Sequence, residues 1–154
     1  TMLRLKEAEH LVAIKWSVPE GEDYDEMRQF SDAFNVIDNT GQQVRCHKNG
    51  GRGYISSLIA VYPPHDLEVW QLLEAHRYDE AQAKLDRVNT ELAPWTAKVG
   101  ARSGGYRSAK AMLAALGQPI GPTRPPTLPA DQDEIAEVRE VLEKLGWLAA
   151  TVLA

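Results

Sequence analysis

The chain has 154 residues, of which 44% are hydrophobic and 25% charged, a composition typical of one globular domain with a sizeable core. The formal net charge is −5, and the interspersed acidic and basic residues exclude the basic surface that a nucleic-acid partner requires. No apolar run approaches the roughly 20 residues that span a membrane, and the single cysteine, Cys46, excludes an internal disulfide framework and favours a cytoplasmic setting.

The first strong signal is a strand predicted over residues 10–17, an apolar run that includes a lysine near its end. In a strand, Ala13 and Lys15 share one face while Ile14 and Trp16 share the other. The pattern is typical of a parallel strand buried on both sides. A lysine is almost never fully buried without a role, and a desolvated amine can attack a carbonyl to form a Schiff base. A lysine that extends to solvent is the alternative.

Helices and strands then alternate along the first half of the chain, which is typical of consecutive βα units and a parallel sheet. Asp23 is expected to cap the helix at 23–30, with Glu26 three residues on as a variant of the capping box. The expected elements are a helix ending near residue 9, a helix at 23–30, a strand at 34–40, a helix at 41–48, a tight turn in the glycine cluster 49–53, and a strand at 54–59.

The second half of the chain is expected to be helical. Apolar residues recur at helical spacing over residues 66–75, 78–92 and 105–116, and Gly117 is expected to end the last of these helices. The stretch at 118–129 is rich in proline and cannot form regular structure.

A final helix is expected to begin after Asp131, with Glu134 at the capping-box position, and to end at Gly146. Its predicted core face carries Ile135, Val138, Val141, Leu142 and Leu145. The sequence therefore predicts an α/β first part and an all-helical second part.

Three parallel strands do not form a stable sheet alone, because such sheets need both faces covered and their edges protected. An eight-stranded βα barrel takes about 250 residues, and this chain supplies only about three of its units. We therefore expect a partner, either a companion chain with the missing strands or a second copy of this chain. Thr1 precedes Met2, so a natural start, a fragment and one half of a split enzyme all stay open.

Four stretches together resemble the dihydrodipicolinate synthase / N-acetylneuraminate lyase family of Schiff-base aldolases. They occur in the family's order at matching spacing over essentially the whole chain. They are Val12–Lys15, similar to the strand that ends in the Schiff-base lysine; Gly50–Ser57, similar to the segment of strand eight; Ser108–Gly117, similar to a family helix; and Gly121–Pro126, similar to the link before the last helix.

The resemblance implies the last three βα units of a TIM (β/α)8 barrel followed by a C-terminal helical bundle, with the barrel part at residues 1–75 and the helical region at 76–154. It implies that Lys15 is the catalytic nucleophile and that Ile55 lines the carboxylate end of the substrate pocket, in addition to core packing. Asp38 and Asn39 lie at the carboxyl end of the strand expected at 34–40, where polar groups line pockets in such barrels. A capping or turn role for the aspartate is an equal alternative.

The function implied is that of a lyase. Lys15 would form an imine with pyruvate or another 2-oxo acid, for carbon–carbon cleavage or condensation, or for hydration or dehydration. The alternative is a non-catalytic half-barrel that acts as an oligomerising or regulatory module. No cofactor is expected, and the four histidines lack the spacing of metal ligands. Cys46 has no evident base beside it and is expected to be a core or surface residue rather than a nucleophile.

Overall fold

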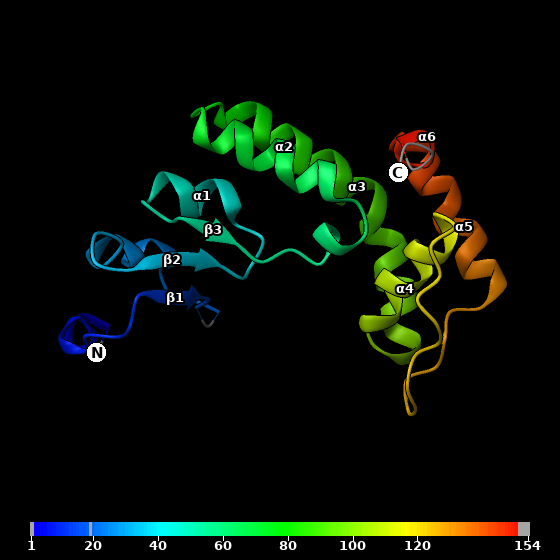
Figure 1. Ribbon diagram of the computed structural model, residues 1–154, viewed down its shortest axis with the longest axis horizontal. Helices are drawn as coiled ribbons and strands as arrows, with labels where there is room; N and C mark the ends of the chain where they lie inside the picture. The colour runs from blue at the N-terminus through cyan, green and yellow to red at the C-terminus, as the bar shows by residue number, and fades with distance from the viewer. Residues whose placement is uncertain (1, 19, 151–154) are drawn as a thin grey trace. The chain divides into compact units, whose positions relative to one another are not determined.

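The computed structural model describes residues 2–18 and 20–150 (Figure 1). Thr1, Pro19 of the expected loop, and residues 151–154 of the expected helical region lie outside the described residues. The chain forms two compact units: one runs to Ser56 and includes Leu73–Tyr78, and the other comprises Ser57–Leu72 and the chain from Asp79 onward. The division expected between residues 75 and 76 stays a prediction.

The first unit contains the expected parallel sheet, with strand order β1-β2-β3 (Figure 1). Its strands are β1 (Ala13–Trp16), β2 (Asn35–Asp38) and β3 (Gly53–Tyr54). The expectation of a strand at 54–59 was wrong, because Tyr54 pairs with Asp38, the last residue of β2, and the chain beyond it has no strand to pair with. Leu58–Ala60 form the short 3-10 helix η3 instead.

Short helices precede and connect the strands. They are η1 (Met2–Glu7), η2 (Tyr24–Gln29) and α1 (Gln43–Lys48). Asp23 caps η2 as expected, but its carboxylate accepts from the backbone N–H of Asp25 at 2.9 Å. The expected reciprocal arrangement with Glu26 is not seen, because the Glu26 N–H donates to the backbone carbonyl of Asp23 at 3.3 Å, as in a 3-10 turn.

Only one face of β1 is buried within this unit. Ile14 and Trp16 lie in a core with Tyr24, Met27 and Phe30, and the Trp16 ring meets the Phe30 ring edge-on with centroids 5.3 Å apart. Lys15, on the other face, is exposed. The expectation of a strand buried on both sides is therefore corrected for the first unit, which provides no second layer over the lysine.

The second unit is helical, as expected, with its own apolar core. Its helices are α3 (Tyr78–Ser103), which starts at the boundary between the units, α4 (Tyr106–Ala115), α5 (Gln132–Lys144) and α6 (Trp147–Ala150), together with most of α2 (Pro63–Glu74). Within the part of the chain that the structure describes, no helix has the length and apolarity needed to cross a membrane.

Helix α3 continues well beyond its expected end at Leu92, through Pro94. Proline removes one helical hydrogen bond, which normally ends or kinks a helix. Here the next turns are anchored by tertiary packing: Trp95 is buried and donates its indole N–H to the carbonyl of Glu134 at 2.9 Å, and Val99 is fully buried.

The connection from α4 to α5 agrees with what the sequence predicts. Gly117, at φ +80°, ends α4, and the proline-rich stretch after it is irregular. Asp131 and Glu134 form the expected capping box of α5. Glu134 also forms an ion pair with Arg107 of α4, and both side chains are buried.

Candidate active site

Lys15 lies near the carboxyl end of β1, on the open face of the sheet. In the register of the sheet, Lys15 pairs with Ile37 of β2, and Ile37 pairs with Gly53 of β3. Paired positions in neighbouring parallel strands point to the same face, so these three residues form one row. Because Gly53 has no side chain and Lys15 is exposed, the row leaves space above the sheet on the side of the amine.

Asn39 and Ile55 lie on the same face as Lys15, two residues further along their strands. The backbone N–H of Asn39 donates to the carbonyl of Trp16 at 3.1 Å, and that of Ile55 donates to the carbonyl of Asp38 at 2.8 Å. These bonds continue the sheet ladder beyond the ends of β2 and β3. Both side chains are exposed, Ile55 by 51%, so the structure brings three of the four expected site residues to one open face.

Asp38 points to the opposite face. It pairs with Trp16 and Tyr54 in the sheet and is fully buried. Its carboxylate accepts five hydrogen bonds, donated by the Tyr24 hydroxyl, the Thr40 N–H and hydroxyl, and the backbone N–H groups of Gly41 and Gln42. The geometry supports the capping and turn role, because the carboxylate organises the loop that leads from β2 into α1.

The sequence interpretation did not single out Tyr24. Its hydroxyl donates to Asp38 Oδ1 at 2.7 Å inside the core. Burial, together with its contacts to Cys46 and Asp38, raises the pKa of Tyr24 far above its usual range. The signal in the sequence was slight: an aromatic residue directly after a helix cap.

Of the two locations expected for Cys46, core or surface, the structure shows the core. Cys46 is 1% exposed, and burial raises the pKa of its thiol, which keeps it in the less reactive protonated form. Among the described residues, no group of three or more His, Cys, Asp or Glu side chains is placed to hold a metal ion. The open face of the sheet therefore carries a primary amine, an amide and an apolar side chain, one from each strand or its end.

No protein-family model matches the sequence, and no curated protein matches it. Solved structures do match. The chain aligns with a dihydrodipicolinate synthase from Thermotoga maritima with a TM-score of 0.76 and 21% identity, over 94% of this chain and 50% of the other. For a putative dihydrodipicolinate synthetase from Pseudomonas aeruginosa the TM-score is 0.75 and the identity 19%, over 94% and 49%.

An N-acetylneuraminate lyase from Fusobacterium nucleatum also matches, with a TM-score of 0.73 and 19% identity, over 93% of this chain and 48% of the other. The chain thus spans about half the length of the solved structures it matches. The resemblance seen in the sequence is confirmed at the level of fold: a partial barrel followed by helices.

Proposed function

From the half-barrel fold that the chain shares with these structures, we propose that it carries the nucleophile of a Schiff-base lyase. The observation that carries the proposal is the position of Lys15: an amine near the carboxyl end of a parallel strand, on the face of the sheet that is left open. Sites in βα barrels are built at that end of the strands. Asn39 and Ile55 on the same face would line the pocket beside it.

In the proposed reaction, the neutral amine of Lys15 attacks the C2 carbonyl of pyruvate or another 2-oxo acid. Water leaves, and the protonated imine then accepts the electron pair released when a carbon–carbon bond breaks or a proton is lost. The same intermediate serves condensation, cleavage, hydration and dehydration. The backbone and side chain at Ile55 would contact the carboxylate end of the substrate, and Asn39 offers an amide donor.

Completion of the site requires further strands. The carbonyls of Val12 and Trp16 accept hydrogen bonds from β2, so the backbone groups of Ala13 and Lys15 point to the outer edge of β1. Val12 is 66% exposed beside this edge. We infer that the rest of a barrel covers this edge of β1, supplied by a companion chain, by another part of a longer chain or by a second copy.

The buried lone thiol of Cys46 supports a reducing, cytoplasmic setting.

Borohydride trapping tests the proposal. The protein is incubated with pyruvate, reduced, and analysed by intact mass and peptide mapping, alone and with a complementary half-barrel added. We expect a pyruvate adduct at Lys15 that is absent from Lys15→Ala. Lys6→Ala, an exposed lysine of the same unit, is the matched control and should retain the adduct. Labelling that survives in Lys15→Ala, or no adduct even with the complementing half, would favour the non-catalytic module instead.

A further inference from the structure

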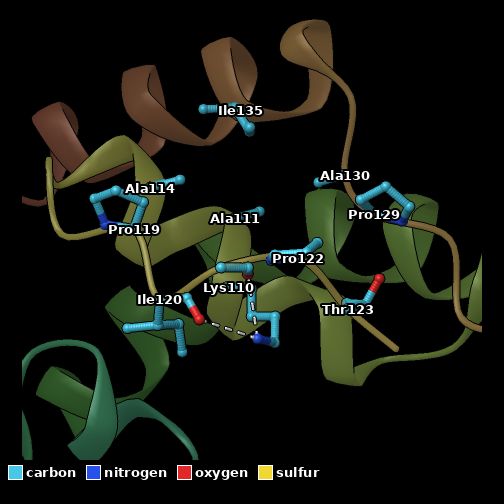
Figure 2. A pocket seen from close by; sticks show the side chains of 11 residues that line it. Lys110, Ala111, Ala114, Pro119, Ile120, Pro122, Thr123, Pro129, Ala130 and Ile135 are labelled. Carbon is cyan, nitrogen blue, oxygen red and sulfur yellow. Dashed lines mark hydrogen bonds between the residues drawn. The ribbon is translucent and has the colours of Figure 1, made fainter. Parts of the chain in front are cut away.

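A small pocket lies within the helical unit, between α4, α5 and the proline-rich link that joins them (Figure 2). Its volume is about 160 Å³, comparable with an engineered cavity of about 150 Å³ that binds benzene. Ala111 and Ala114 of α4, Pro119 and Ile120 of the link, and Ile135 of α5 provide apolar walls. The pocket is therefore large enough for a ligand of benzene size and is mostly apolar.

One formal charge lines this pocket, the ammonium of Lys110. Lys110 and Ala114 are one helical turn apart, so they lie on the same side of α4 and the small alanine leaves room beside the lysine stem. The Lys110 Nζ donates to the backbone carbonyls of Ile120 at 3.5 Å and Gly121 at 3.2 Å, as the dashed lines in Figure 2 indicate. None of the residues that line the pocket is acidic.

These two bonds use two of the three N–H donors of the half-buried ammonium, so one donor is available to a ligand in the pocket. Both bonds are also longer than the usual 2.9–3.0 Å. Within residues 2–18 and 20–150, no carboxylate lies within 4.0 Å of Lys110 Nζ, whereas Lys98 in the same unit contacts Glu137 at 2.5 and 2.7 Å. A charge-assisted bond to an anion would be shorter and about twice as strong as a bond to a neutral acceptor.

The geometry points to a binding site for a small monocarboxylate with a short apolar body. The carboxylate would accept a hydrogen bond from Lys110 Nζ, and the apolar body would contact Ala111, Ala114 and Ile135. This site is separate from Lys15 and does not depend on the lyase chemistry. We expect affinity on the order of 1 mM, because a ligand of this size makes few contacts.

Isobutyrate is a suitable probe, because it is about the size of benzene and has no ketone with which Lys15 could form an imine. It is titrated into the full chain labelled with ¹⁵N, with isobutanol as the uncharged analogue. We expect shifts that saturate and that cluster at Ala111, Ala114, Ile120 and Gly121. Isobutanol should bind at least about tenfold more weakly, since its neutral hydroxyl accepts a weaker hydrogen bond from the ammonium than a carboxylate does.

Three variants locate the site. Lys110→Met keeps the stem but removes the charge and should weaken isobutyrate about tenfold. Ala114→Leu should abolish binding by filling the pocket, while Lys144→Met, an exposed lysine of α5, should leave it unchanged. Circular dichroism of each variant checks folding. Absence of saturable binding to the unmodified chain, equal binding of isobutanol, or binding that both pocket variants retain would overturn the proposal.

Discussion

The buried carboxylate of Asp38 gives the sharpest test of how the sheet unit is held together. Asp38→Asn preserves the size of the side chain and removes only the charge and one acceptor oxygen. In the native structure Oδ1 accepts from the Tyr24 hydroxyl and both donors of Thr40, while Oδ2 accepts from the N–H groups of Gly41 and Gln42. The asparagine amide can satisfy one of these two sets and presents its own N–H groups to the other.

The expected loss follows from the number of bonds affected. If the amide oxygen takes the position of Oδ1, two N–H donors lose a charged acceptor, and each such bond contributes about 1.5–3 kcal/mol. The gross loss is about 3–6 kcal/mol, and the variant no longer buries a charge, which offsets part of it. We therefore expect the free energy of unfolding of the sheet unit to fall by about 3 kcal/mol.

Hydrogen exchange measures this loss of stability in the sheet unit itself, separately from the helical unit. The Asn39 N–H, which donates to the carbonyl of Trp16, should exchange more than about a hundredfold faster in Asp38→Asn. Asp32→Asn, at an exposed aspartate of the same unit, is the control and should change exchange little. Exchange that is unaltered in Asp38→Asn while pyruvate labelling is lost would refute the structural role and make Asp38 a pocket residue.

Gly51→Ala should destabilise the sheet unit by about 1–3 kcal/mol, because the added Cβ would lie 2.8 Å from a backbone oxygen of α1. Gly53→Ala, with its nearest side-chain atom at 3.8 Å, should be nearly neutral in urea denaturation, and equal losses would contradict this. Glu134→Leu should cost about 3–5 kcal/mol by leaving the buried Arg107 without its carboxylate. Adding Arg107→Met should restore part of that loss in a double-mutant cycle, so simply additive losses would exclude the coupling. Burial lowers the pKa of His65, so below about pH 6.5 the unfolded chain binds a proton that the folded unit excludes. The thermal midpoint of the helical unit should therefore fall as the pH drops, and a slope unchanged by His65→Gln would rule out this cause.

Local signals in the sequence were sufficient for the elements that local chemistry determines. The capping box of Asp131 and Glu134 and the end of α4 at Gly117 depend on residues within one turn of the chain. The end of α3 was not predictable in this way, because the helix passes Pro94 through packing of Trp95 against a helix distant in sequence. The early end of β3 likewise depends on where β2 ends.

The sequence predicts which residues could form the candidate site, but not how they are arranged. Alternation along one strand separates Lys15 from Trp16, but only the register between strands shows that Asn39 and Ile55 share the lysine face and that Asp38 does not. The two alternatives for Asp38 could not be separated from the sequence, because its five donors include Tyr24, which is distant along the chain. Long-range register was the missing information.

Lys15, the proposed nucleophile, lies on an outermost strand of the sheet, so its activity would depend on the binding equilibrium that brings the remaining strands to that edge. If the remaining strands belong to a separate polypeptide, the fraction of Lys15 held in a closed pocket equals the fraction of chains bound, which rises with the concentration of that polypeptide. A dilute solution would then contain mostly inactive halves. The rate of the reaction would then increase with the concentration of the scarcer half.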